Sequence, residues 1–300
     1  MKTLVVLTGP TGVGKTELSL RLAEALGSPI LNCDSRQIFR EMSIGTAAPT
    51  PEQLSRVRHY FIATKSIHEP YSAAKFEIEA LTLLNTLFSS HETLLMTGGS
   101  MMYIDAVCKG IDDMPDVDSQ VRAELAALYQ EQGLAPILKE LQRLDPVYFD
   151  QVDKKNHKRV IHGLELCRMT GLPFSSFRKD KAKVRPFNIV KICLNRDRQE
   201  LYNRIDQRVD EMMAQGLEAE ARNLYPFKAL NALNTVGYKE MFAWFDGKCT
   251  LEEATQTLKY NTHQYARKQL TWFRKDSGYH WFHPDDVDII EKIMFCLTIP

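Results

Sequence analysis

The sequence predicts an α/β fold, in which a parallel sheet that carries a phosphate-binding loop is flanked by helices and interrupted by a mostly helical insertion. Three observations favour this fold class. A short apolar run, Thr3–Thr8, leads directly into a glycine-rich motif, Gly9–Thr16, and then into an amphipathic segment. Apolar runs and helical patterns then alternate, which is typical of a parallel sheet covered on both faces. Between residues 113 and 185 the strand pattern disappears.

The N-terminal elements are expected in strand–helix order. Thr3–Thr8 is rich in β-branched residues and leucine, as in a buried parallel strand. An amphipathic helix should cover Thr16–Leu26 and stop at Gly27, because glycine readily adopts the left-handed conformation that ends helices. The elements expected next are a strand over Pro29–Cys33 that ends at Asp34, a helix over residues 73–90, a strand over Thr93–Thr97, and a helical run after Gly98-Gly99-Ser100.

The pattern changes near Asp112. From Asp118 to Gly171 the sequence shows helical periodicity and no convincing strand. A strand is expected again over Phe187–Leu194, followed by helices over residues 198–215, 217–225, 238–246 and 251–274. We therefore expect residues 1–112 and 186–300 to form one α/β catalytic core, and residues 113–185 to form a helical insertion.

The composition excludes several classes of protein. With 300 residues the chain can bury a sizeable core. No apolar run approaches the length that spans a bilayer, so we expect no membrane partner. The six cysteines form no C-x-x-C pair, which gives no support to a zinc site or a disulfide framework. A reducing cytoplasm is the expected location.

The neutral net charge hides two regions of opposite sign. From Ile111 to Asp153 there are ten acidic and three basic residues, a net charge of −7. From Lys154 to Arg198 there are thirteen basic and three acidic residues, a net charge of +10. Such a basic segment is typical of a surface that contacts phosphate backbones. The alternative is a solvated helical face balanced by its acidic neighbour.

The glycine-rich motif matches the phosphate loop G-x-x-x-x-G-K-[ST] and lies between a strand and a helix, as its mechanism requires. Its backbone amides and the helix N-terminus attract phosphate oxygens. Lys15 can reach a terminal phosphate, and Thr16 can ligate Mg²⁺. The alternative is a glycine-rich turn without a ligand. The residues expected to bind a diphosphate or nucleotide are Gly9, Pro10, Thr11, Gly12, Val13, Gly14, Lys15 and Thr16.

The loop alone does not identify the reaction. A nucleotidase needs an aspartate at the end of a central strand, but Thr93–Thr97 runs into Gly98-Gly99-Ser100 without a carboxylate. The strand that does lead to a carboxylate is the second, at Asp34. Two alternatives remain at this point. They are a small-molecule kinase with Asp34 as the base, and a nucleotide-switched RNA-binding module that uses the same loop and the basic segment.

An ordered set of motifs along nearly the whole chain resembles the tRNA dimethylallyltransferases, the bacterial isopentenyltransferase family. The motifs are Gly9–Thr16, Asp34-Ser-Arg-Gln37, Ile44-Gly-Thr46, Gly98-Gly-Ser100 with Tyr103, Asp145-Pro146, Asn156 with Arg159, Leu164-Glu165, Thr170-Gly-x-Pro173, Arg204-Ile-Asp-Gln-Arg208, Val236-Gly-Tyr-Lys-Glu240 and Tyr265–Arg274. The resemblance implies transfer of a dimethylallyl group from dimethylallyl diphosphate to the exocyclic amine of the adenosine 3′ to the anticodon of tRNA. It also implies a Mg²⁺ cofactor, and we expect a monomer with a tRNA-binding insertion.

Four side chains are expected to be catalytic: Asp34, Lys15, Ser100 and Arg208. Asp34 would accept the amine proton, although an aspartate at a strand end can also simply start a turn. Lys15 would stabilise the leaving diphosphate, together with Arg204 or Arg208 on one helical face. The alternative for these arginines is surface ion pairing with Asp206 or Asp210.

The resemblance also implies tRNA contacts. We expect residues near the target base to line a channel for a flipped adenosine. Tyr265–Arg274 interleaves aromatic and basic residues, but Tyr265, Leu270 and Phe273 could equally belong to the core. The family commonly has Thr in place of Ser100, Asp in place of His157, and Arg in place of His162 and His263. The expected tRNA-binding residues are Asp34, Ser35, Arg36, Gln37, Ser100, Arg122, Lys158, Arg159, Val160, Ile161 and His162.

Overall fold

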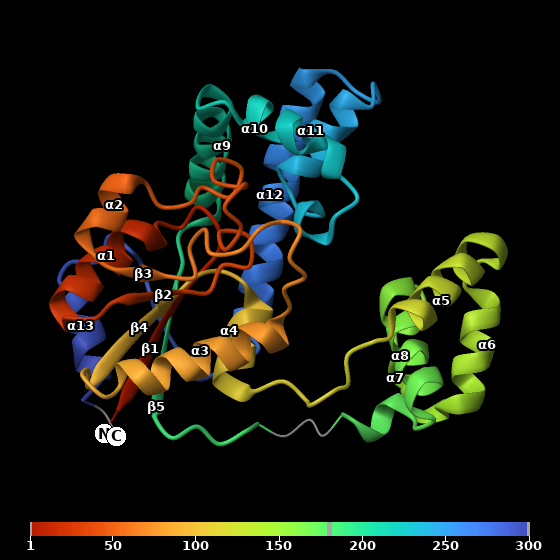
Figure 1. The fold of residues 1–300 in the computed structure, drawn as a ribbon. Coiled ribbons are helices and arrows are strands. Elements are labelled where there is room, and N and C mark those ends of the chain that lie inside the picture. The colour runs from red at the N-terminus through yellow and green to blue at the C-terminus, as the bar shows by residue number, and fades with distance from the viewer. Residues whose placement is uncertain (1, 179–181, 299–300) are drawn as a thin grey trace. The chain divides into compact units, whose positions relative to one another are not determined.

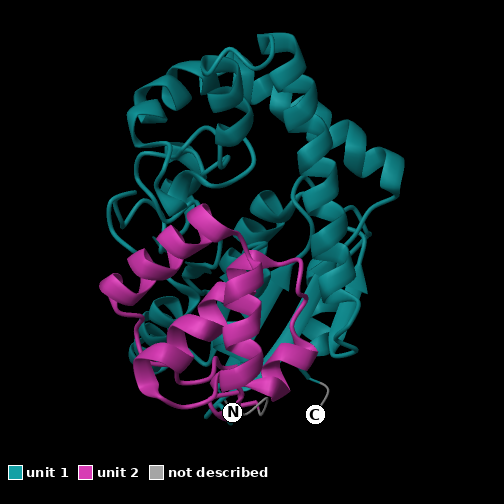
Figure 2. Ribbon diagram, turned by 90° about the vertical axis from the view of Figure 1, so that its right-hand side faces the viewer, with its two compact units in different colours: residues 1–109, 184–300 teal, residues 110–183 magenta. Residues whose placement is uncertain are grey.

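The computed structural model describes residues 2–178 and 182–298. The chain forms two compact units (Figure 2): unit 1 comprises Met1–Lys109 with Val184–Pro300, and unit 2 comprises Gly110–Lys183. The sequence had suggested residues 113–185 for the insertion. Each unit has its own hydrophobic core and is described by itself.

Unit 1 is built on a six-stranded sheet in which every neighbouring pair of strands is parallel (Figure 1). In spatial order the strands are β3 (His59–Tyr60), β2 (Ile30–Asn32), β4 (Thr93–Thr97), β1 (Thr3–Thr8), β5 (Asn188–Leu194) and β6 (Tyr279–Phe282). In register, Leu7 of β1 lies beside Thr97 of β4, and Thr8 lies beside Cys193 of β5. The fold class expected from the sequence is therefore confirmed.

Helices cover both faces of this sheet. Successive side chains of a strand point to opposite faces, so a strand that is apolar along its whole length needs a cover on each side. Leu4 and Val6 of β1 join one buried cluster, whereas Val5 and Leu7 join another. The helices of unit 1 are α1 (Lys15–Leu26), α2 (Pro51–Arg56), α3 (Ala73–Leu87), α4 (Met101–Lys109), α9 (Arg198–Ala214), α10 (Leu217–Leu224), α11 (Tyr238–Phe245), α12 (Leu251–Phe273) and α13 (Ile289–Cys296), with 3-10 turns at Tyr225–Phe227 and Asn231–Leu233.

Local signals explain where the helices next to the phosphate loop begin and end. Gly14 precedes α1 with φ 107°, and Gly27 ends it with φ 58°, where its N–H bonds the carbonyls of the last turn. The longest helix, α12, begins at a capping box in which Thr250 and Glu253 each bond the other's backbone N–H. Helices α9 and α12 pack against each other, so α12 brings distant residues to the loop.

Helices joined by loops make up unit 2, and none of its described residues belongs to a strand. Its elements are α5 (Ser119–Gln132), α6 (Ala135–Leu144), α7 (Pro146–Gln151), α8 (His157–Thr170) and a 3-10 turn at Phe174–Ser176. They enclose a core that includes Leu125, Leu141, Leu164 and Phe174. Asp145 is fully buried. Its carboxylate accepts from the backbone N–H of Tyr148 in the first turn of α7, and from both the backbone N–H and the hydroxyl of Ser175. Buried apolar surface and a satisfied carboxylate thus hold this unit together.

The sequence missed four elements of unit 1: α2, α13, β3 and β6. The short helix α2 and the two-residue strand β3 fall below the length at which periodicity can be recognised. The strand β6 is an edge strand in which His280 and Trp281 are exposed, so it lacks the apolar run of a central strand. Helix α3 ends at Leu87, where residues up to 90 had been expected to be helical.

Among the helices that the structure describes, none is both long enough and apolar enough to cross a bilayer. All six cysteines are free thiols, and only Cys249 is more than slightly exposed.

A candidate active site at the phosphate loop

The loop Gly9–Thr16 connects β1 to α1 and is held in a conformation that needs glycine. Gly9, Gly12 and Gly14 have φ values of 148°, 81° and 107°. A Cβ atom on Gly9 would lie 2.7 Å from the carbonyl oxygen of Leu194, and one on Gly12 would lie 2.8 Å from the side chain of Ile205. The loop therefore lies directly against β5 and α9. No side chain caps α1 at Gly14, so the amides of its first turn remain available to an anion.

Lys15 points into the space enclosed by the loop. Its ammonium donates to the carbonyl oxygens of Gly9 (3.0 Å) and Pro10 (2.8 Å). Burial, and next the positive charge of Arg208, lower the pKa of Lys15 to about 8. A bound diphosphate would offer this ammonium a charged partner in place of two neutral carbonyls.

Two arginines of α9 complete the cationic wall. Arg204 donates to the carbonyl oxygen of Gly12 (3.0 Å). Arg208 donates to the hydroxyl of Thr11 (3.2 Å) and to the carbonyl of Thr46 (3.4 Å), and burial lowers its pKa. The aspartates proposed as alternative partners face other residues: Asp206 Oδ1 lies 2.8 Å from His263 Nε2, and Asp210 pairs with Lys259 at 2.7 Å. The ion-pairing alternative for the arginines is therefore wrong.

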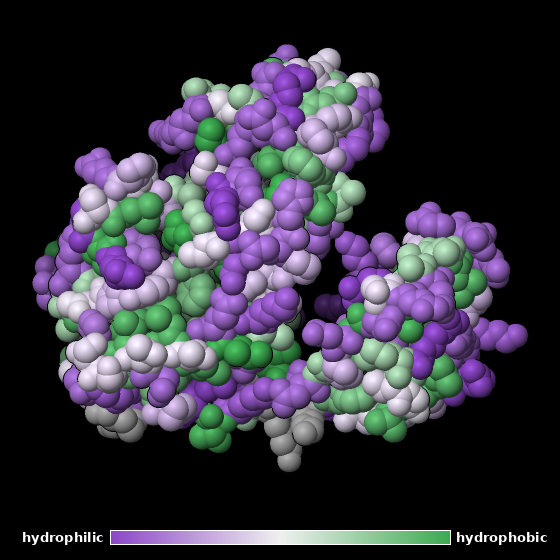
Figure 3. Space-filling model, in the orientation of Figure 1, coloured by the Kyte–Doolittle hydropathy of each residue, from purple (hydrophilic) through white to green (hydrophobic). Residues whose placement is uncertain are grey.

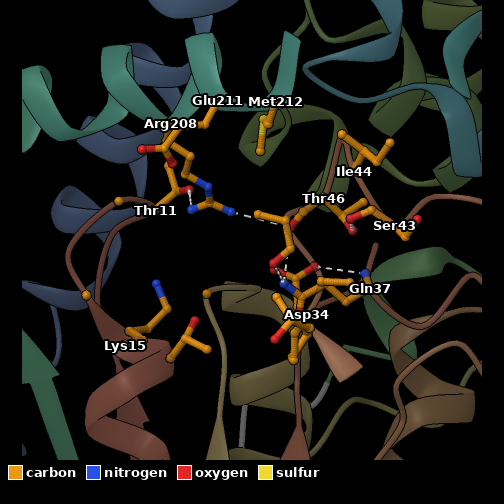
Figure 4. Close-up of a pocket in the computed structure, with 18 of the residues that line it drawn as sticks. Thr11, Lys15, Asp34, Gln37, Ser43, Ile44, Thr46, Arg208, Glu211 and Met212 are labelled. Carbon is orange, nitrogen blue, oxygen red and sulfur yellow. Dashed lines mark hydrogen bonds between the residues drawn. The ribbon is translucent and has the colours of Figure 1, made fainter. Parts of the chain in front are cut away.

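Asp34 lies opposite these cations, just after β2 (Figure 4). Its Oδ1 atom accepts from the backbone N–H groups of Arg36 (2.8 Å) and Gln37 (3.3 Å), so this oxygen starts a turn. No donor among the described residues bonds Oδ2. The turn and the proton-accepting role are thus compatible, since they use different oxygens of one carboxylate.

The residues around Asp34 are fixed by contacts within unit 1. The Ser100 hydroxyl accepts from the Ser35 N–H (2.8 Å) and donates to the Ser35 hydroxyl (3.0 Å). Gln37 donates to the carbonyls of Thr46 and Ala47, and Arg36 donates to those of Asn231 and Ala232. The side chains of Arg36 and Gln37, expected to bind tRNA, are therefore already engaged by the backbone of their own chain.

Two neighbouring cavities open beside these groups. The first has a volume of about 700 Å³ and is lined by the loop residues together with Asp34, Arg204 and Arg208. The second has a volume of about 350 Å³ and adds Ser100, Arg36 and apolar side chains of α9 and α12. The residues that line both cavities are Thr11, Asp34, Thr46, Arg208, Met212 and Tyr265. Figure 4 shows Lys15 and Arg208 directed into one space, with Asp34 at its side.

Thr16 is the predicted metal ligand. It is exposed in the first turn of α1 and lines the first cavity beside Lys15. A hydroxyl at this edge suits Mg²⁺, which takes few protein ligands and completes its shell with phosphate oxygens and water. A second group that could hold a metal is Glu200 with His283 and Asp285, but the Arg196 guanidinium already pairs with both carboxylates.

The other predicted tRNA-binding residues belong to unit 2. Arg122 and His162 both contact Glu165, at 3.2 Å each, and both side chains remain about half exposed. Val160 is fully buried in the core of this unit, so the expected contact of its side chain with tRNA is wrong. Lys158 and Arg159 are exposed on α8, and Ile161 is half-buried. In the view of unit 2 in Figure 3, hydrophilic residues cover much of its helices.

The basic segment Lys154–Arg198 is divided between the two units. Its C-terminal part lies in unit 1, where Arg185 forms a buried ion pair with Glu77, Lys191 pairs with Asp276, and Arg196 pairs with Glu200 and Asp285. These cations balance acidic neighbours within the fold. The exposed cations that remain available near the start of α8 are Lys154, Lys155, Lys158 and Arg159.

Two polar residues that hold the site together were not singled out from the sequence. Glu220 of α10 accepts from the backbone N–H groups of Ile44 and Gly45 and from the Tyr238 hydroxyl. Gln269 of α12 is 1% exposed and bonds the backbone at Thr11 and Gly99. A glutamine between Ala266 and Phe273, on the buried face of a helix, is a signal that could have been noticed. Phe273 is indeed core, whereas Tyr265 lines both cavities.

The parallel sheet carries a phosphate loop, three cations converge on one cavity, and a carboxylate lies opposite them. This arrangement is typical of proteins that transfer or bind a phosphorylated group, and it is suited to holding a diphosphate with a proton acceptor beside it. A family model described as IPP transferase matches residues 37–276. The chain belongs to the IPP transferase family, and it is an enzyme of the prenyltransferase kind.

Individual relatives cover nearly the whole chain. It is 57% identical over 290 residues to tRNA dimethylallyltransferase 2 of Parabacteroides distasonis, with 97% of each chain covered. It is 61% identical over 283 residues to tRNA dimethylallyltransferase 2 of Porphyromonas gingivalis, with 94% of each covered. The crystal structure of the full-length tRNA isopentenylpyrophosphate transferase of Bacillus halodurans is similar at a TM-score of 0.71 and 36% identity, over 98% of this chain and 94% of that one. A eukaryotic dimethylallyltransferase, at a TM-score of 0.80 and 23% identity, shares the fold.

Proposed function

We propose that this enzyme transfers a dimethylallyl group from dimethylallyl diphosphate to the exocyclic amine of the adenosine 3′ to the anticodon of tRNA and releases diphosphate. The observation that carries this proposal is the convergence of Lys15, Arg204 and Arg208 on a cavity that Asp34 also lines. The cations suit a leaving group that gains negative charge, and the carboxylate suits a nucleophile that loses a proton.

The donor diphosphate would lie on the loop side of the first cavity. The amides of the loop and of the first turn of α1 would receive phosphate oxygens, and Lys15 and the two arginines would stabilise charge as the carbon–oxygen bond of the donor breaks. Thr16 would help to hold Mg²⁺, which supplies further positive charge to the diphosphate when bound. The electron pair of the broken bond leaves with the diphosphate.

The acceptor amine would approach from the second cavity, beside Asp34 and Ser100. Its lone pair is delocalised into the purine, so it attacks weakly while it keeps its proton. As the new carbon–nitrogen bond forms, Asp34 takes the proton, and its free Oδ2 oxygen is suited to this step. The hydroxyl of Ser100 is anchored to Ser35 and would line the path of the base.

Unit 2 would bind the body of the tRNA. Lys154, Lys155, Lys158 and Arg159 support this assignment, because they are exposed and form no ion pair with an acidic side chain that the structure describes, so they can gain from phosphate contacts. The target base must leave its stack to reach Asp34.

The test is direct. Purified protein, Mg²⁺, dimethylallyl diphosphate and unmodified tRNA are incubated without any nucleoside triphosphate, and the tRNA nucleosides are analysed by mass spectrometry. We expect an adenosine heavier by one dimethylallyl group at the position 3′ to the anticodon. A strict requirement for ATP, or the absence of this product, would contradict the proposal.

A further inference from the structure

Gln269 connects two loops that are far apart in the sequence. Its side-chain carbonyl accepts from the backbone N–H of Thr11 (2.9 Å), and its amide donates to the carbonyl of Gly99 (2.8 Å). The side chain is 1% exposed, so both ends must be satisfied within the protein. The donor at Thr11 and the acceptor at Gly99 also fix which end of the amide is which.

One end of this side chain holds the donor side of the site. Thr11 belongs to the phosphate loop, and its hydroxyl accepts from Arg208, one of the cations of the cavity. A shift of Thr11 would therefore move both the loop backbone and the partner of Arg208.

The other end holds the acceptor side. Gly99 precedes Ser100, whose hydroxyl binds Ser35, the residue next to Asp34. A Cβ atom on Gly99 would lie 2.5 Å from the amide nitrogen of Gln269, so only glycine allows this approach. A continuous set of contacts thus runs from Gln269 through Gly99, Ser100 and Ser35 to the carboxylate.

We propose that Gln269 is a positioning residue that sets the separation between the diphosphate-binding loop and the Asp34 carboxylate. This inference rests on the proposed function, since it concerns the geometry of the transfer step. Displacement of reacting groups by about 1 Å can cost about 10²-fold in rate. A side chain that fixes two loops at once should act on the transfer step more than on the binding of either substrate.

The experiment compares two variants with a matched control. Gln269→Met keeps the length of the side chain and removes both hydrogen bonds. Gln269→Glu keeps the acceptor for Thr11 but places an oxygen against the carbonyl of Gly99. Gln256→Met makes the same chemical change at an exposed position of α12. Each protein is assayed for its single-turnover rate at saturating substrates, its affinities for inorganic diphosphate and tRNA, and its thermal unfolding temperature.

We expect Gln269→Met to lower the single-turnover rate by about 10- to 100-fold, while both affinities stay within about threefold of wild type. Gln256→Met should match the wild type. Gln269→Glu should also be slow at neutral pH, but its rate relative to wild type should rise as the pH falls, because a protonated carboxyl can donate to Gly99. Gln269→Met should lack this pH-dependent recovery.

The outcomes separate this inference from the proposed function. If the wild type makes product and Gln269→Met turns over as fast as Gln256→Met, the positioning role is wrong. If rate, both affinities and unfolding temperature fall together, and acid does not restore Gln269→Glu, Gln269 only maintains the fold and the inference is equally wrong. Absence of product from the wild type would overturn the proposed function and this inference with it.

Discussion

The cations of the cavity and the cations of unit 2 differ in what surrounds them. Lys15, Arg204 and Arg208 donate to carbonyl or hydroxyl oxygens of the loops around the site, and burial lowers the pKa of Lys15 and of Arg208. Lys155 and Lys158 are exposed to solvent. Arg204 is exposed, but all three cations of the first group are held in position beside the loop, so this group should act on the chemistry. The second group should act on affinity and should depend on salt.

The largest effect should come from the carboxylate that faces the cations of the cavity. Asp34→Asn preserves size but removes the acceptor for the amine proton, so the single-turnover rate should fall by about 10²–10⁴-fold. Affinity for tRNA should change much less, because it depends on many dispersed contacts. A variant with a near-normal rate and weak tRNA binding would make Asp34 a recognition residue.

Removal of a buried cation should have the next largest effect. Lys15→Ala deletes a charge aimed at the leaving diphosphate, and we expect the transfer rate to drop by about 10²–10³-fold. Single-turnover kinetics with saturating donor measure this drop. The matched control is Lys268→Ala, at an exposed position of α12. Equal rates for the two variants would show that the donor diphosphate binds elsewhere.

The pH dependence of donor binding should distinguish Lys15 from the exposed lysines. The pKa of Lys15 is lowered to about 8, so the ammonium is charged below this pH and loses its proton above it. Affinity for inorganic diphosphate should therefore fall as the pH rises above about 8, by up to about tenfold per pH unit. Calorimetric titrations from pH 7 to 9.5 measure this change. In Lys15→Arg the charge persists, so this decrease should disappear.

The smallest effect on catalysis, and the clearest effect of salt, should come from unit 2. Replacing Lys154, Lys155 and Lys158 together by Gln should reduce the slope of log tRNA affinity against log salt by about two to three units, at roughly 0.7–0.9 per lost phosphate contact. The single-turnover rate at saturating tRNA should stay near that of wild type. Filter-binding titrations across a salt series measure the slope, and an unchanged slope would exclude this cluster from the tRNA path.

The sequence predicted those parts of the site that are determined locally. The loop is recognisable because glycine positions, the preceding strand and the following helix are adjacent in the chain. Asp34 is recognisable because it follows an apolar strand. The contacts of Gln269 with Thr11 and Gly99, and of Glu220 with the backbone of Ile44, join residues at least 170 positions apart, so no local pattern encodes these contacts. Residues 154–198 were likewise expected to share one basic surface because they are consecutive in the chain. They are divided between the two units, and several of their cations form ion pairs within unit 1.

The ends of unit 2 lie side by side. Gly110, its first residue, has φ 87°, and a Cβ atom there would lie 2.6 Å from the side chain of Lys183, its last residue. Lys183 also pairs with Asp113. A segment whose two ends meet leaves only a short gap when it is removed, so a few glycines and serines could join Lys109 to Val184. In evolutionary terms such a module can be gained, lost or exchanged in one genetic event while the sheet and its phosphate loop remain intact.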